Sequence, residues 1–140
     1  NPRNYVFNRE AIQVEAKTGA QRKLIDYRGK TPRMYNATKV PGNVWNFPRV
    51  RYKMPEYRSH PSQKPESLLE RIILASSHVG DTVLDPFAGS FTTASVCARL
   101  GRSSISIEQE ESHGETGRQR IIEALNTSGE GACVVHRWKG

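Results

Sequence analysis

The chain has 140 residues, of which 36% are hydrophobic, and its 21 Lys and Arg against 14 Asp and Glu give a formal net charge of +7. This length suits one domain, which would bury about two-thirds of its unfolded surface on folding. No apolar run approaches the roughly 20 residues of a membrane-spanning helix, and no secretory leader opens the chain, so we expect a cytoplasmic protein without membrane partners.

The positive charge is concentrated in the first part of the chain. Residues 1–60 hold 13 Lys and Arg against four Asp and Glu, whereas residues 61–140 hold eight against ten. The first part also holds eight of the 11 aromatic residues: Tyr5, Phe7, Tyr27, Tyr35, Trp45, Phe47, Tyr52 and Tyr57. Such a composition suits a surface that neutralises phosphates and supports unstacked bases. It equally suits a solvated basic loop with core aromatics.

In chain order, residues 4–14 alternate in character and predict a strand. Residues 16–57 are polar, basic and interrupted by seven Gly and Pro residues, which predicts a long irregular segment. Segments of this kind are usually functional or disordered, so we expect target recognition here, with ordering on DNA. The candidates for phosphate contacts are Lys39, Arg49, Arg51, Lys53 and Arg58, and a solvated basic face is the alternative.

An α/β pattern follows. Pro65 suits the first position of a helix whose apolar face runs from Leu68 and whose pattern ends at Gly80. After it we expect a strand at 82–85, a helix at 92–100, a strand at 103–108 and a helix at 114–125. This order predicts parallel strands with a right-handed crossover. The chain thus divides into a basic recognition region with part of the sheet (1–59), a cofactor-binding α/β half (60–125) and a flexible tail (126–140).

A turn rich in small residues, Asp-Pro-Phe-Ala-Gly-Ser-Phe-Thr-Thr at 85–93, joins the first of these strands to a helix. Glu108 closes the next strand. Ligands of open α/β sheets bind beyond the carboxyl ends of the strands, so Asp85 and Glu108 should face one crevice, with Glu108 placed to bind a ribose. Gly89 permits a close backbone approach. Because neither a phosphate loop nor Gly-x-Gly-x-x-Gly is present, a nucleoside with a small charged tail fits better than a nucleoside triphosphate or NAD.

The turn resembles the S-adenosylmethionine motif of bacterial DNA amino-methyltransferases. The upstream His-Pro-Ser-Gln-Lys-Pro at 60–65 is similar to an element that precedes this motif only in the circularly permuted, beta-type members. Residues 4–8 and 44–50 also resemble these enzymes, most closely the orphan adenine-N6 methyltransferases. The resemblance covers about residues 1–121. It implies part of a Rossmann-like methyltransferase fold, S-adenosylmethionine as cofactor, and double-stranded DNA as partner, with a homodimer as a further expectation.

The resemblance also implies individual roles. Asp85 would lie near the methionine amino group, Glu108 would accept hydrogen bonds from both ribose hydroxyls, and Lys64 would pair with the methionine carboxylate. The other cofactor-binding candidates are Phe87, Ala88, Gly89, Ser90, Phe91, Thr92 and Gln109. The alternatives are a turn or capping aspartate, an exposed glutamate in an acidic run, and one more surface lysine. We expect His60 to support its loop rather than to act in catalysis.

Two features of the family differ here. Many members carry Gly where this chain has Phe91, and the residues after Glu108 depart from the usual pattern. More importantly, the chain has no Pro-Pro pair, whereas the family holds the target amino group with an Asp/Asn/Ser-Pro-Pro-aromatic loop. We therefore assign no catalytic residue. We expect the carboxyl-terminal portion of an adenine-N6 methyltransferase, inactive by itself.

Three alternatives stay open: cytosine-N4 methylation, an inactive relative that binds DNA or cofactor, and an RNA or protein methyltransferase. No metal is predicted, because His78, His113 and His136 lack ligand spacing with one another or with the cysteines. Cys97 and Cys133 are expected to be buried structural thiols.

Overall fold

The computed structural model describes residues 5–17 and 24–128. Cys133, His136 and the predicted tail beyond residue 128 lie outside the described residues. Residues 126–128 instead belong to the last helix. None of the helices in the described ranges is both long enough and apolar enough to span a membrane.

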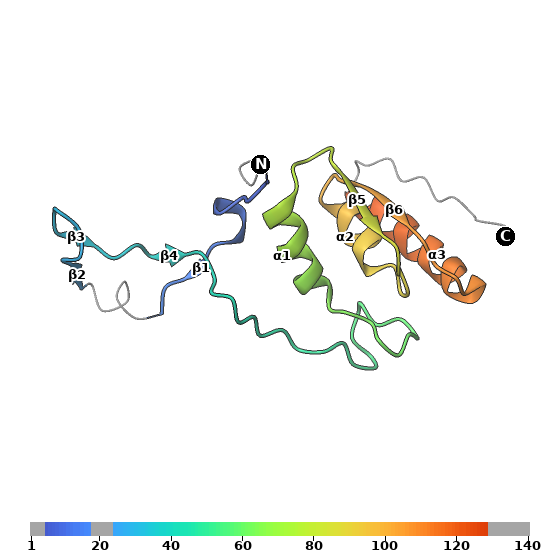
Figure 1. Cartoon of the computed structure of the whole chain (residues 1–140). Helices are drawn as coiled ribbons and strands as arrows, with labels where there is room; N and C mark the ends of the chain where they lie inside the picture. The colour runs from blue at the N-terminus through green and yellow to red at the C-terminus, as the bar shows by residue number, and fades with distance from the viewer. Residues whose placement is uncertain (1–4, 18–23, 129–140) are drawn as a thin grey trace.

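The carboxyl-terminal half forms an α/β unit. Its elements, in order, are α1 (Glu66–Ser76), β5 (Thr82–Asp85), α2 (Thr92–Arg99), β6 (Ser103–Ser106) and α3 (Glu111–Ser128). Strands β5 and β6 are parallel, with Thr82 opposite Ser103 and Asp85 opposite Ser106. Figure 1 shows the three helices beside this strand pair. The predicted β-α-β-α order is confirmed, and the unit is part of a Rossmann-like α/β fold.

Helix α2 is the centre of the core. It is built from small and apolar residues and packs against α1 and α3, so it is buried on almost every side. On one side, Val96 and Cys97 contact Ile73 of α1, and on the other, Ala94 contacts Ile121 of α3. Cys97 is buried, as predicted.

The boundaries of the second strand and the last helix differ from the prediction. Strand β6 ends at Ser106, because its partner β5 turns away at Pro86, which has no N–H to continue a ladder. One further bond, from the Ile107 N–H to the Asp85 carbonyl, closes the pairing. Helix α3 begins at Glu111, three residues earlier than predicted, where an acid suits the first turn.

The predicted strand at residues 4–14 is wrong for most of its length. Its described part holds a short 3-10 helix, Glu10–Ile12, and only Val14–Glu15 (β1) is extended in a ladder. The backbone N–H of Asn8 donates to the Ala75 carbonyl, and its side-chain amide donates to the carbonyls of Leu74 and Ser77. These contacts satisfy the free carbonyls at the end of α1, and this docking takes the place of a longer strand.

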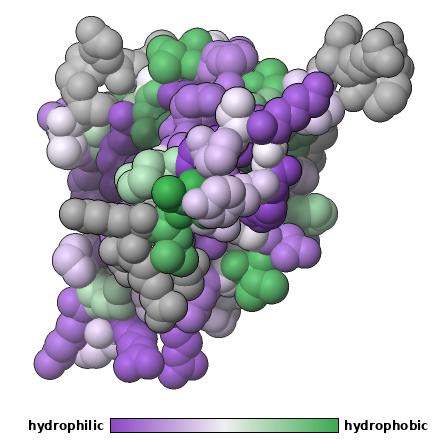
Figure 2. All heavy atoms as spheres, turned by 90° about the vertical axis from the view of Figure 1, so that its left-hand side faces the viewer, coloured by the Kyte–Doolittle hydropathy of each residue, from purple (hydrophilic) through white to green (hydrophobic). Residues whose placement is uncertain are grey.

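The basic segment is irregular from residue 40 to residue 57, as predicted, but its described earlier part holds short strands. Strand β4 (Thr38–Lys39) pairs with β1, and β2 (Ile25–Asp26) pairs with β3 (Arg33–Met34), both antiparallel. Neither pair joins β5 and β6, so the described recognition region adds no strand to the α/β sheet. In Figure 1 the β2–β3 hairpin lies far from the α/β unit, and Figure 2, seen from that side, shows hydrophilic and hydrophobic side chains interspersed.

Candidate functional site

The turn after β5 holds Asp85 at the carboxyl end of the strand. Oδ1 of Asp85 accepts the Phe87 N–H at 3.1 Å, and Oδ2 accepts the Thr93 hydroxyl at 2.5 Å. The backbone reverses through Gly89, whose φ is +52°, before α2 begins. Asp85 therefore orders its own turn, as one alternative reading expected, while its carboxylate also faces the space beside the turn.

That space is a cavity of about 420 Å³ between α1, β5, the turn and the loop at residues 60–64. Seven of the ten predicted cofactor-binding residues line it: Lys64, Asp85, Phe87, Ala88, Gly89, Ser90 and Thr92. Phe91, Glu108 and Gln109 are not among the lining residues. Sequence reasoning missed the apolar wall, which is formed by Leu69, Ile72, Ile73, Val83 and Leu84. The helical apolar pattern of α1 marked Ile72 and Ile73 only as core positions.

Residues of the loop at 60–64 also line the cavity. His60 lies directly over Gly89, where a Cβ would come within 2.9 Å of His60 Nε2. Gly89 is thus required both for its positive φ and for this close approach. Lys64 is exposed, and its ammonium donates to the Ser62 carbonyl at 2.9 Å. Lys64 therefore adds a solvent-exposed cation to the cavity lining.

Glu108 lies behind the turn and holds it in place. Its Oε2 accepts the Gly89 N–H at 2.7 Å, and its Oε1 accepts the Glu110 N–H at 2.9 Å. The Glu110 N–H does most to hold the pKa of Glu108 below its ordinary value, helped by the Gly89 N–H and opposed by burial. The carboxylate is therefore ionised at neutral pH, and each oxygen retains a lone pair for another donor. Gln109 is exposed beside it.

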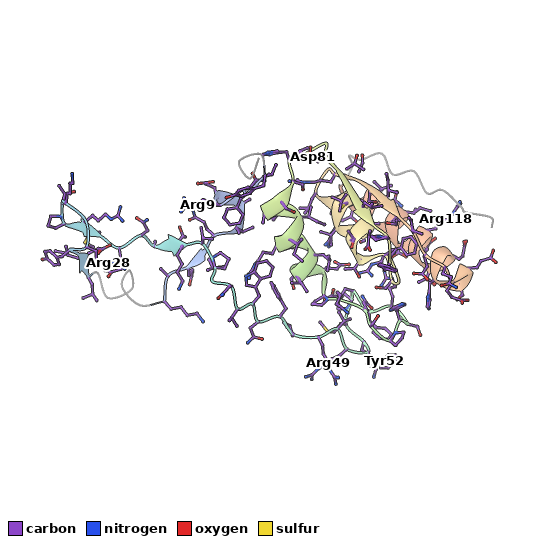
Figure 3. The ribbon with its side chains drawn as sticks, viewed as in Figure 1. Arg9, Arg28, Arg49, Tyr52, Asp81 and Arg118 are labelled. Atoms are coloured by element: carbon purple, nitrogen blue, oxygen red, sulfur yellow. The ribbon has the colours of Figure 1, made fainter. Side chains whose placement is uncertain are left out.

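The predicted phosphate-binding residues divide into two groups. Lys39, Arg49, Arg51 and Lys53 are exposed, and Figure 3 shows Arg49 pointing away from the α/β unit. Arg49 also lines a second cavity of about 420 Å³ with Trp45, Phe47 and Lys64. The guanidinium of Arg71 on α1 lies 5.3 Å from the Trp45 ring and 4.6 Å from the Phe47 ring. These cation–π contacts anchor the segment to α1.

Arg58 differs from the other four. Its Nη2 forms an ion pair with Glu123 of α3 at 2.7 Å, and its Nη1 donates to the Tyr57 carbonyl at 2.9 Å. Gln63 accepts the Arg58 N–H and donates to the Glu56 carbonyl, which ties this stretch to the cofactor loop. Arg58 therefore connects parts of the protein, and its guanidinium is less available for a phosphate.

Phe91 supports the turn from the side away from the cavity. Its backbone is left-handed, with φ of +55°, a conformation that is strained for a bulky residue. The ring is buried against α3, where a Cβ on Gly117 would lie only 2.1 Å from it. The absence of a side chain at Gly117 thus makes room for the Phe91 ring, which stands where many family members have glycine. The ring does not pack in the cofactor cavity.

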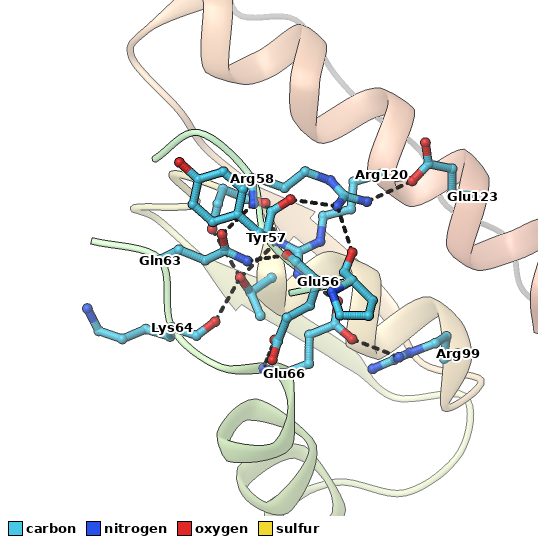
Figure 4. A network of polar contacts seen from close by, with 12 residues as sticks. Glu56, Tyr57, Arg58, Gln63, Lys64, Glu66, Arg99, Arg120 and Glu123 are labelled. Carbon is cyan, nitrogen blue, oxygen red and sulfur yellow. Dashed lines mark hydrogen bonds and ion pairs between the residues drawn. The ribbon is translucent and has the colours of Figure 1, made fainter. Parts of the chain in front are cut away.

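Arg120 of α3 clamps the same turn, and sequence reasoning missed it (Figure 4). Its Nη1 donates to the Ser90 carbonyl at 2.8 Å and to the Thr92 hydroxyl at 3.1 Å, while its Nη2 pairs with Glu66 of α1 at 2.6 Å. Burial lowers the pKa of Arg120 and Glu66 raises it, yet a guanidinium stays charged. The only signal in the sequence is that Arg120 falls on the apolar face of α3, between Gly117 and Ile121.

Together these contacts can hold a small zwitterion and a nucleoside. An anion, Asp85, and a cation, Lys64, lie on the cavity wall, and a second carboxylate, Glu108, lies beside the turn. Within the described residues no three His, Cys, Asp or Glu side chains are grouped as metal ligands would be.

Known proteins resemble the chain over most of its length. A family model for DNA methylases of the N6/N4 type matches residues 1–119. The chain is 58% identical over 137 residues to the DNA adenine methyltransferase YhdJ of Escherichia coli K12, covering 98% of this chain and 47% of that protein. It is 40% identical to the type II methyltransferase M.HpaI of Haemophilus parainfluenzae, covering 90% of this chain and 37% of that protein.

Among solved structures, a complex of M1.HpyAVI with SAM is 34% identical, with a TM-score of 0.48, over 60% of this chain and 47% of that one. The chain spans less than half the length of these relatives. Because the family model matches most of its residues, the chain belongs to the N6/N4 DNA methylase family.

Proposed function

We propose that this chain is the recognition and cofactor-binding portion of a DNA methyltransferase that transfers the methyl group of S-adenosylmethionine to adenine N6. The observation that carries the proposal is the cavity at the end of β5, where Asp85 and Lys64 present opposite charges beside the Gly89 turn. Opposite charges that line the same cavity suit the amino-acid tail of the cofactor.

The chain's own residues would bind and orient the cofactor. Asp85, held by Phe87 and Thr93, retains acceptor capacity for the ammonium group. Lys64 would exchange the Ser62 carbonyl for the cofactor carboxylate, and Glu108, which holds the Gly89 N–H, would accept hydrogen bonds from the ribose hydroxyls. When bound, the cofactor supplies an electrophilic sulfonium methyl group. Orientation by these groups would account for much of the rate enhancement.

Two observations favour adenine in DNA. The relative at 58% identity is named as a DNA adenine methyltransferase, and the exposed cations Lys39, Arg49, Arg51 and Lys53 precede the cofactor cavity. The amino group of a paired adenine is not accessible, so the base must be flipped out of the duplex. Since the chain has no Pro-Pro pair and spans less than half of its relatives, methyl transfer would need residues beyond those described here.

Calorimetric titration of the chain with S-adenosylmethionine tests the cofactor half. We expect saturable binding that Asp85→Ala and Glu108→Ala each weaken by at least about tenfold, which corresponds to 1.4 kcal/mol. Glu115→Ala removes an equal charge from the exposed face of α3 and should bind as the unmodified chain does. A folded chain that shows no binding would contradict the proposal.

A second ligand separates the roles of the charged groups. 5′-Methylthioadenosine keeps the nucleoside but lacks the amino-acid tail. Lys64→Met should weaken S-adenosylmethionine binding without affecting this analogue, whereas Glu108→Ala should weaken both. Equal losses for the two ligands in Lys64→Met would contradict the assignment of Lys64 to the carboxylate.

A further inference from the structure

The β2–β3 hairpin, residues 24–35, has two different faces. Ile25 lies opposite Met34 and Asp26 lies opposite Arg33 in the ladder. Because side chains alternate across a strand, Ile25, Tyr27 and Met34 share one face, and Asp26, Arg28, Arg33 and Tyr35 share the other. One face is therefore apolar and the other is predominantly basic.

Asp26 organises the basic face. It is the single buried residue between positions 24 and 39, at 6% exposure. Its carboxylate accepts two bonds from the Arg28 guanidinium, at 2.9 and 3.1 Å, and lies 3.9 Å from Nε of Arg33. Arg28 also lies over the Tyr35 ring, 5.5 Å from its centroid. The arginine side chains remain 77% and 73% exposed, so their heads are held in position yet face solvent.

The hairpin carries more positive charge than it neutralises. Its three basic residues are Arg28, Lys30 and Arg33, and its one acidic residue is Asp26. Lys30 is exposed in the turn. Guanidinium groups that are already held in position lose less entropy on binding, and they match phosphate oxygens in geometry. A two-stranded ribbon also fits the width of the DNA major groove. The surface is thus complementary to a nucleic-acid duplex in both charge and shape.

We propose that the basic face of the β2–β3 hairpin contacts the phosphate backbone of duplex DNA through Arg28, Lys30 and Arg33. This contact is additional to the one expected at Lys39 and residues 49–53, and it rests on the proposed function, which makes DNA the partner. Figure 3 places Arg28 at the far end of the molecule from Arg118, and well away from Arg49. The duplex would therefore extend beyond the cofactor cavity and be held by the hairpin at a distance from the methylated base.

The test measures binding of the chain to a fluorescent duplex by anisotropy over a series of salt concentrations. Each phosphate contact adds about 0.9 to the slope of log affinity against log salt concentration. Arg28→Gln with Arg33→Gln should lower the slope by about 1.8, because it removes two contacts. Arg9→Gln with Arg118→Gln removes the same charge elsewhere and should leave the slope close to that of the unmodified chain.

Substitutions at Lys30 distinguish a lost DNA contact from a misfolded hairpin. Arg28→Gln and Arg33→Gln leave Asp26 without its partners, whereas Lys30→Gln changes only an exposed turn residue. Lys30→Gln should lower the slope by about 0.9, and Lys30→Arg should restore it. If duplex binding persists with an unchanged slope in all hairpin variants, the hairpin does not contact DNA and its exposed faces serve a protein partner or a second copy. If the unmodified chain does not bind the duplex, the DNA partner of the proposed function fails as well.

Discussion

The α/β unit and the basic segment are stabilised by different interactions. In the α/β unit, helix α2 is buried on almost every side, and Val96 and Cys97 are completely inaccessible to solvent. In the basic segment, Asp26 is the single buried residue from 24 to 39. Residues 40–65 contact the α/β unit through cation–π contacts and hydrogen bonds. A buried core gives the first region one conformation. The second presents charge and aromatic surface that a partner can complete.

The two regions meet at the cofactor turn, and this is where the comparison can be tested. Arg120 and Phe91 hold the turn from the α3 side, whereas His60 and Lys64 approach it from the loop that follows the basic segment. Variants on the α3 side should therefore affect global stability. Variants on the side of the segment should affect local order.

The largest expected effect is that of Arg120→Met. Removing one partner of a buried ion pair leaves Glu66 poorly compensated and frees the Ser90 carbonyl, so the free energy of unfolding should fall by about 3 kcal/mol. Urea unfolding followed by circular dichroism measures it. Arg99→Met, which removes the more exposed partner of Glu66, should cost clearly less. Equal losses in the two variants would mean that the buried Arg120 contacts contribute no more to stability than the exposed Arg99–Glu66 pair.

Gly117→Ala should cause the second largest loss of stability. The new methyl group would overlap the Phe91 ring, and overpacking of a core contact costs about 1–3 kcal/mol. Thermal unfolding measures the loss. Phe91→Ala should remove most of the additional cost of Gly117→Ala, so the double variant should be more stable than the sum of the two single losses predicts. Strict additivity would show that the Phe91 ring and residue 117 are not coupled through packing.

Arg58→Met should have a smaller and local effect. The Arg58–Glu123 pair is partly exposed, so its loss should cost about 0.5 kcal/mol of global stability. Hydrogen exchange should nevertheless accelerate at the backbone amides of Tyr57 and His60, which bond within the segment, while amides of α2 stay protected. Glu123→Gln is the matched control and should reproduce this pattern. Faster exchange in α2 would show that the two regions are not separable.

The smallest effect concerns pH. Bonds from Arg28 lower the pKa of Asp26 from 3.8 to about 2, opposed by burial. A folded pKa below the unfolded one contributes stability that is complete above about pH 4 and is lost as the pH falls toward 2. Nuclear magnetic resonance titration of the carboxyl carbon should find this low value and its return toward 3.8 in Arg28→Gln. An unshifted value in the unmodified chain would mean that the hairpin face is not organised as described.

The sequence by itself determined the α/β order and the position of the cofactor turn. Periodic apolar residues marked α1 and α2, and small residues after Asp85 marked the turn, because burial of local patterns and backbone freedom at Gly89 depend on near neighbours in the chain. Seven of the ten residues that the family motifs indicate, including Lys64, line the cavity.

Only the tertiary structure decided what stands behind that turn and what holds the basic segment. Phe91 faces Gly117, Arg120 reaches Ser90 and Glu66, and Asn8 caps α1, all across more than 20 residues of chain. No periodicity reports such pairs, because each depends on where two distant elements meet in space. The same reason explains why the local pattern wrongly predicts a strand at residues 4–14. Their backbone donors find carbonyls at the end of α1, which no local pattern reveals.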